Sequence, residues 1–221
     1  MIRSRSNPGF AICNPEHLSA RRIARLAPLV ALALCLLAPL SAWCGDPAWR
    51  VLIEPKFMKH EVSYPIPGST RAVLVPALLK DGEPVCMTQK EFKALGVDWP
   101  AFLQSAAENA AAELKKLTPD YTRDRKKVIE FATLTSDNPL NAGTILSPDF
   151  LKMFADTLGP KLIIAIPDRY TIYVFPALAS NYADYSPMIS TAYHATSYPV
   201  SMEAYELSDH GLKSIGIYQE P

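Results

Sequence analysis

The sequence lacks several features that mark common classes of protein. Only 4 of its 221 residues are cysteines, and three of these, Cys13, Cys35 and Cys44, lie in the first 44 residues, which excludes a disulfide framework. The 9 glycines form neither a phosphate-binding loop nor a dinucleotide fingerprint, and no Gly-x-Ser-x-Gly motif occurs. With 22 basic and 22 acidic side chains, the basic excess typical of nucleic-acid-binding proteins is also missing. We therefore expect no nucleic-acid partner.

The first 44 residues have the layout of a secretory signal peptide. Five arginines and one acid precede an uncharged apolar run, Leu26–Ala42. That run is shorter than the roughly 20 apolar residues of a membrane-spanning helix, and two prolines interrupt it. We expect cleavage near Cys44 and Gly45, export to the periplasm or the medium, and no stable transmembrane anchor.

Two other kinds of leader share parts of this pattern. Cys44 stands where a lipoprotein signal ends, but Trp43 occupies a position at which such a signal has a small residue. The pair Arg21-Arg22 is found in twin-arginine signals, although the usual Phe-Leu does not follow it here. Trp43 therefore favours an ordinary cleaved leader over a lipid anchor, and the arginine pair alone does not establish a twin-arginine signal.

The remainder of the chain has the size of one domain. Because the leader carries five basic residues and one acid, residues 45–221 keep 17 basic and 21 acidic side chains. This length matches the prior of about 150 residues per domain, and no linker-like segment divides it. We expect residues 45–71 to be an N-terminal extension, with a first strand at Trp49–Ile53 and an irregular loop, and residues 72–218 to be the domain.

Hairpins separated by helices are expected along this domain. The expected hairpins are Ala72–Leu79 with Pro84–Met87, Lys161–Ile166 with Tyr170–Phe175, and Met202–Leu207 with Leu212–Tyr218. A further strand is expected at Val128–Leu134, and helices are expected after Thr88, Asp98, Ser147 and Asn181. Since Pro76 has no N–H to donate, its strand is expected at a sheet edge. The pattern predicts an α+β fold with a mostly antiparallel sheet, built from hairpins, and helices packed on it.

The helix expected after Asp98 has one apolar face. Its apolar residues at helical spacing are Leu103, Ala107, Ala110, Leu114 and Leu117. Charged and amide side chains fall mainly outside this stripe. We expect the stripe to lie against the sheet.

Three segments resemble a known family. They are the extended segment before Thr88, the run Phe92–Val97 that leads into a helix containing Ala106–Asn109, and the central Ile164–Arg169. Over about residues 73–216 the sequence resembles the YtpQ-like family of bacterial proteins of unknown function. Members usually lack a leader, and their common Pro-Asn-Arg-Asp turn is Pro167–Tyr170 here. The resemblance implies an architecture and leaves the function open.

The best polar candidates for a site lie at the turn of the central hairpin. A rigid hairpin can present the charges of Asp168 and Arg169 to a polar or anionic ligand. The simpler interpretation is that the aspartate stabilises the turn and the arginine is solvated. If His194 converged on this turn from its own element, the three side chains would suit a hydrolase or another small-molecule enzyme.

No pattern in the sequence indicates a metal or a cofactor. The histidines after the leader are His60, His194 and His210, and no two have the spacing that places a metal pair on one helix face. Cys86 lies between apolar residues in an expected strand, which favours a buried structural thiol over a nucleophile. We therefore expect neither a metal site nor a cofactor.

Tyrosine is concentrated towards the C-terminus. Eight of the 10 tyrosines lie in the last 52 residues, and Tyr182 and Tyr185 fall where they can share a helix face. Tyrosine suits binding surfaces, although packing within strands and helices accounts for the same enrichment. Together, the leader, the tyrosine-rich C-terminal third and the absence of catalytic motifs predict a non-catalytic exported module that binds a protein or another component of the cell envelope. The alternative is an enzyme with its site near Asp168, Arg169 and His194.

Overall fold

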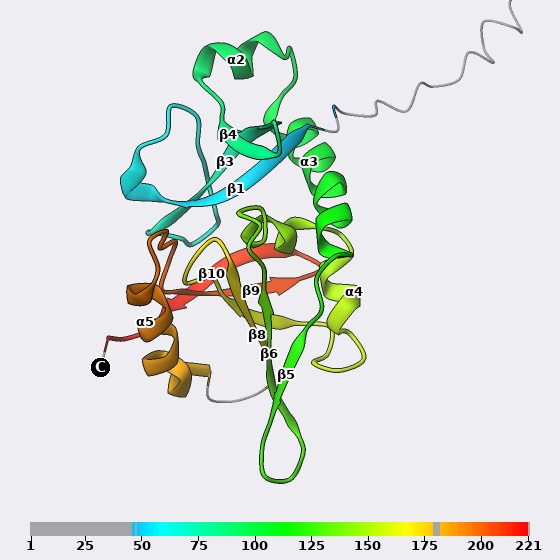
Figure 1. The fold of residues 1–221 in the computed structure, drawn as a ribbon, viewed down its shortest axis with the longest axis vertical. Helices are drawn as coiled ribbons and strands as arrows, with labels where there is room; N and C mark the ends of the chain where they lie inside the picture. Colours follow the sequence, from blue (N-terminus) through cyan, green and yellow to red (C-terminus); the bar gives the residue numbers. More distant parts are fainter. Residues whose placement is uncertain (1–45, 47, 179–181, 221) are drawn as a thin grey trace, which may run out of the picture. The chain divides into compact units, whose positions relative to one another are not determined.

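The computed structural model describes residues 46, 48–178 and 182–220 (Figure 1). The expected leader and the cleavage site near Cys44 and Gly45 lie outside the described residues. The described residues belong to one compact unit in which helices pack on antiparallel sheets, so the α+β fold class is confirmed. Within the same residues, no helix combines the length and the apolar character needed to cross a bilayer.

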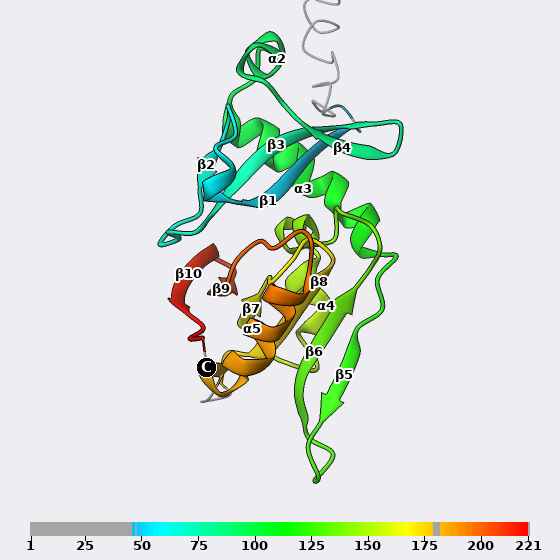
Figure 2. The ribbon, with the colours of Figure 1, turned by 60° about the vertical axis from the view of Figure 1, so that its left-hand side comes forward.

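The first sheet has four strands and is built around β3 (Figure 2). Its elements are β1 (Trp49–Pro55), the 3-10 turn η1 (Lys56–Met58), β2 (Tyr64–Pro65), β3 (Ala72–Lys80) and β4 (Glu83–Cys86). β1 pairs with β3 over its whole length, and all seven of its residues are buried. Residues 45–71, which we expected to be an extension, thus supply two strands of the domain.

The expectation that Pro76 lies in an edge strand is wrong, because β3 is the central strand of this sheet. The carbonyl of Pro76 accepts a hydrogen bond from the N–H of Met87 at 2.9 Å. The N–H and C=O of one residue in an antiparallel strand face the same neighbour. That side of β3 pairs with β2 up to Leu74 and with β4 from Ala77 onwards. The Pro76 nitrogen therefore faces Met87, one residue beyond the end of β4, and its missing N–H costs only the reciprocal bond at the end of this ladder.

The second sheet has six strands in the order β10-β9-β7-β8-β6-β5. They are β5 (Asp120–Arg123), β6 (Ile129–Thr135), β7 (Leu162–Ala165), β8 (Thr171–Pro176), β9 (Glu203–Ser208) and β10 (Gly211–Ile217). The hairpins expected around β3, β7 and β9 are confirmed, and β7 and β8 are central in this sheet. Two sheets are present where one was expected, and β5 was not expected because its residues are polar and exposed or half-exposed.

The helical elements are α2 (Gln89–Ala94), α3 (Trp99–Leu114), η2 (Ala142–Leu146), α4 (Phe150–Phe154), η3 (Tyr182–Tyr185) and α5 (Ser186–Ala195). The helix expected after Thr88 is α2, which begins with a capping box of Thr88 and Glu91, and the Asp98 carboxylate accepts a hydrogen bond from Ala101 N–H at the start of α3. α3 lies against β1. Its buried apolar face consists of Phe102, Ala106, Ala110 and Leu114. Relative to the expected stripe, this face is rotated so that Leu103 and Ala107 are only half-buried.

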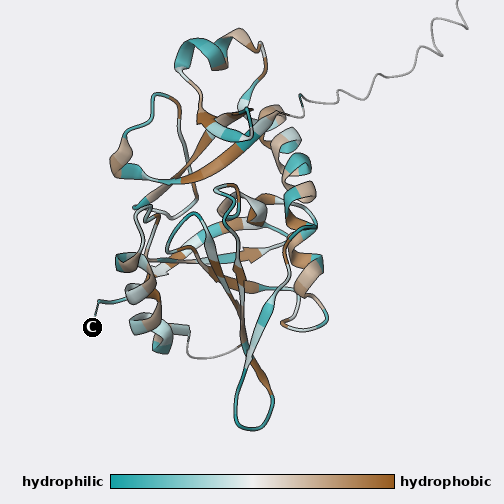
Figure 3. Ribbon diagram, in the orientation of Figure 1, coloured by the Kyte–Doolittle hydropathy of each residue, from teal (hydrophilic) through white to brown (hydrophobic). Residues whose placement is uncertain are grey.

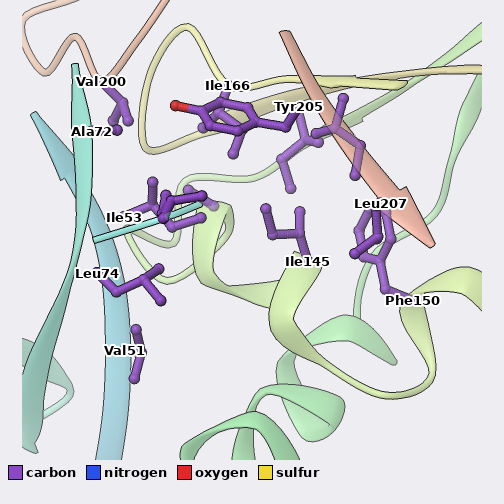
Figure 4. Packing of buried hydrophobic residues seen from close by; sticks show 14 of the residues in the cluster. Val51, Ile53, Ala72, Leu74, Ile145, Phe150, Ile166, Val200, Tyr205 and Leu207 are labelled. Carbon is purple, nitrogen blue, oxygen red and sulfur yellow. The ribbon is translucent and has the colours of Figure 1, made fainter. Parts of the chain in front are cut away.

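One hydrophobic core joins the two sheets (Figure 4). Ile53 of β1 and Leu74 of β3 belong to the same cluster as Ile145 of η2, Phe150 of α4 and Tyr205 of β9. Burying a side chain of this size contributes roughly 1.5–3 kcal/mol to stability. The shared core makes the two sheets parts of one domain and fixes the surfaces that border their junction.

Candidate functional site

A cavity of about 640 Å³ lies where the two sheets meet, and we call it the sheet-junction groove. Its walls come from α3, the segment after β2, the η2–α4 region and the β9–β10 hairpin. Apolar residues that line it include Ile66, Trp99, Leu103, Ala107, Leu151 and Leu212. Small-molecule sites in proteins commonly have volumes of about 300–1,000 Å³ and largely apolar walls. The groove therefore has the size and the lining of a ligand-binding site.

The Trp99 wall of the groove is held by aromatic stacking. The rings of Trp99 and Tyr64 are nearly parallel, with centroids 3.8 Å apart. Tyr64 in turn contacts Phe92 of α2 at a centroid distance of 6.0 Å. Pro100 lies in the first turn of α3, where a proline fits without the loss of a helical hydrogen bond. The stacking on Tyr64 thus fixes the position of Trp99 in the wall of the groove.

The exposed polar side chains of the groove lie at its rim. Gln104 and Asp209 are exposed, and Asp209 retains 83% of its side-chain accessibility. The buried Ser147 hydroxyl accepts a hydrogen bond from the backbone N–H of Asp149 at 3.2 Å. An apolar interior with a polar rim suits a molecule that buries an apolar body and leaves a polar end in water. The negative charge of Asp209 disfavours an anionic end.

The two charges at the central hairpin are engaged inside the fold. The Arg169 Nη2 atom donates to Oε2 of Glu54 at 2.7 Å, and its guanidinium lies over the Tyr198 ring. Burial lowers the pKa of Arg169, but the hydrogen bond and the charge of Glu54 outweigh it and raise that pKa. Asp168 is buried, which raises its pKa, and it accepts a hydrogen bond from Tyr170 N–H at 2.7 Å. Arg169 therefore links the hairpin turn to β1.

His194 does not share a site with that turn. Its Nε2 atom lies 3.6 Å from the Glu220 carboxylate, its side chain is 59% exposed, and its ring contacts Tyr193. Within the described parts of the chain, no hydrogen bond or ion pair connects His194 with Asp168 or Arg169. The geometry thus gives no support to an enzyme site built from these three residues.

Tyr182 and Tyr185 take part in packing. The Tyr185 ring stacks on Phe175 at 4.8 Å and meets Phe131 edge-on at 5.2 Å, while Tyr182 meets Tyr218 at 5.9 Å. Burial raises the pKa of Tyr185. Both side chains are half-buried, so only part of each ring is open to a partner. These contacts agree with the packing interpretation of the tyrosine enrichment.

The surroundings of Cys86 keep its thiol protonated. Burial and the negative charge of Glu54 both raise the pKa of Cys86, whereas a nucleophilic thiol needs a lowered pKa. The His60 Nε2 atom lies 3.7 Å from the Glu54 carboxylate. Among the residues that the structure describes, no three His, Cys, Asp or Glu side chains are arranged to hold a metal ion.

Glu203 of β9 is a buried carboxylate that the sequence did not single out. It accepts hydrogen bonds from Ser69 Oγ at 2.5 Å, Thr70 N–H at 2.8 Å and Tyr205 Oη at 2.9 Å. Burial alone would raise the pKa of Glu203, but the hydrogen bonds, chiefly those from Ser69 and Thr70, lower it. Ser69 lies 134 positions away in the chain, so no local sequence pattern predicts this contact. Glu203 ties the loop before β3 to the second sheet.

Comparisons with protein-family models, with curated proteins and with solved structures find no match for this chain. The likeness to YtpQ-like proteins consequently stays a prediction from the residues quoted above.

Proposed function

We propose that this protein is a non-catalytic exported binding module of the cell envelope, and that the sheet-junction groove holds an apolar component of that compartment. The observation that carries the proposal is the groove itself, with about 640 Å³ of space, mostly apolar walls and exposed polar groups at the rim. We propose export because residues 1–44 have the layout of a secretory signal peptide. We also propose that the chain is related to YtpQ-like proteins, because of the segments that resemble that family.

The chemistry of the groove favours an uncharged ligand. Association is driven by the removal of apolar surface from water, at about 25 cal/mol per Å². Leu103 and Ala107 of α3 line the same cavity as Leu212 of the β9–β10 hairpin. A ligand with a hydroxyl, amide or amine at one end can keep that group near Gln104 and Asp209. A carboxylate or phosphate there would be repelled by Asp209.

Filling the groove is expected to abolish this binding. The substitution Ala107→Phe places a large ring into the space between α3 and the β9–β10 hairpin, because Ala107 is a half-buried lining residue. We expect it to weaken the affinity for the uncharged fluorophore N-phenyl-1-naphthylamine at least tenfold, which is about 1.4 kcal/mol. The measurement is a fluorescence titration of the chain recovered after export with its own leader.

The matched control is Ala112→Phe, which makes the same change on an exposed position of the same helix. It should bind the fluorophore as the wild type does. Equal affinity in the wild type and both variants, or no binding by the wild type, would show that the groove is not the binding site.

A further inference from the structure

The turn that follows β1 presents two adjacent apolar side chains to water. Phe57 is 64% exposed and Met58 is 53% exposed, and both lie in η1, none of whose residues is buried. Lys59 follows in the left-handed conformation, with φ at 51°, and ends the turn. Figure 3 shows brown at this turn beside teal segments. We call residues 56–59 the Phe57 turn.

Cations without ion-pair partners surround this apolar tip. Lys56 and Lys59 flank it, and Arg71 lies beside it because the Arg71 carbonyl accepts a hydrogen bond from Lys56 N–H at 2.7 Å. None of these three cations forms an ion pair with a described residue. The acid nearest to Lys59 in sequence, Glu61, instead accepts a hydrogen bond from Gln89 N–H at 3.0 Å.

The Phe57 turn and Arg71 line a common cavity. Lys56, Phe57 and Arg71 line a space of about 350 Å³, together with Tyr193 of α5. Two cations and an aromatic ring around one concave surface match a molecule that carries a phosphate next to apolar chains. This arrangement is present on a surface separate from the sheet-junction groove, which is lined by other residues.

We propose that the Phe57 turn and Arg71 dock the protein on an anionic phospholipid surface. Phe57 and Met58 enter the boundary between head groups and acyl chains, and Lys56, Lys59 and Arg71 contact the phosphates. Each cation near such a surface strengthens binding about fivefold. A neutral phospholipid surface supplies no such attraction, so the apolar tip alone binds it weakly. This inference does not depend on what occupies the groove.

The insertion step is tested with a local fluorescent reporter. Phe57→Trp keeps an aromatic ring at an exposed position and reports its own surroundings. With vesicles that contain phosphatidylglycerol, we expect its emission to shift to the blue and to be quenched by brominated phosphatidylcholine in the same vesicles. With vesicles of phosphatidylcholine alone we expect neither change.

The matched control is Val128→Trp, at a 59% exposed apolar position next to the basic Arg125–Lys127 turn. Equal quenching at both positions, or none at either, would overturn the proposal.

The electrostatic step is tested in the same background. Lys56→Gln combined with Arg71→Gln should weaken binding of the Phe57→Trp chain to phosphatidylglycerol vesicles at least tenfold. Arg125→Gln combined with Lys126→Gln removes the same charge elsewhere and should leave binding unchanged. All four side chains are exposed, so the variants should unfold at the wild-type temperature. If both pairs have the same effect, or if inorganic phosphate changes the emission of Phe57→Trp while vesicles do not, the membrane assignment is wrong.

Discussion

Arg169→Met is expected to destabilise the folded protein by about 3–5 kcal/mol. The Glu54 side chain is 1% exposed, and Arg169 is its hydrogen-bonded partner at 2.7 Å. Removal of the guanidinium leaves a carboxylate in the interior whose remaining ion-pair partner among the described residues is His60, at 3.7 Å. The loss should appear as a lower urea midpoint with an unchanged slope in equilibrium unfolding at pH 7.

An exposed ion pair of equal length provides the control. Lys152 lies 2.7 Å from Asp149, but its side chain is 75% exposed, so Lys152→Met should change stability by less than about 1 kcal/mol. Glu54→Met combined with Arg169→Met should be more stable than Arg169→Met alone, because no charge is then left buried without a partner. Equal effects of Arg169→Met and Lys152→Met would contradict the assignment of Arg169 to a structural link between the sheets.

Glu203→Ala is expected to cost about 3 kcal/mol, because it removes the acceptor of several hydrogen bonds at once. Ser69 Oγ, Thr70 N–H and Tyr205 Oη all donate to this carboxylate, and Glu203 is 1% exposed. The truncation also separates the loop before β3 from β9. Equilibrium unfolding at pH 7 measures the loss, with the exposed Glu83→Ala as a control that should stay within about 0.5 kcal/mol of the wild type.

The same carboxylate should make stability depend on pH. Its pKa in the folded protein is lowered, from an unfolded value of about 4.3. The stabilisation is therefore fully present above pH 4.3 and is lost as the pH falls through the folded pKa. Glu203→Gln cannot ionise, so the difference between wild type and this variant should shrink as the pH falls below about 4. A difference that is constant from pH 7 to pH 3 would show that the charge does not stabilise the fold.

Local chemistry in the sequence predicts much of the fold. Asp81-Gly82 predicts the hairpin of β3 and β4, and Thr88 with Glu91 predicts the start of α2. The division into two sheets depends on which distant strands pair, and no local sequence pattern predicts that pairing. Pro76 is an example: its missing N–H favours an edge strand in the sequence, whereas β3 is central and Pro76 lies between the end of its pairing with β2 and the end of its pairing with β4.

The candidate site is predicted only in part for the same reason. Helical spacing identifies Leu103 and Ala107 as apolar positions of one helix, but it does not distinguish a core face from a groove wall. Their role depends on Leu212, which comes from the far end of the chain. Glu54 and Glu203 give no signal in the sequence, because their partners Arg169 and Ser69 lie more than 100 positions away.

The native mass of the chain recovered after export with its own leader tests the central claim most directly. We expect a chain that begins near Gly45 and carries one apolar molecule. That molecule should be absent from Ala107→Phe and present in Ala112→Phe, because only the former fills the sheet-junction groove. A wild-type chain that begins at Met1, a wild-type chain without a ligand, or a ligand that persists in Ala107→Phe would contradict an exported binding module with its site in this groove.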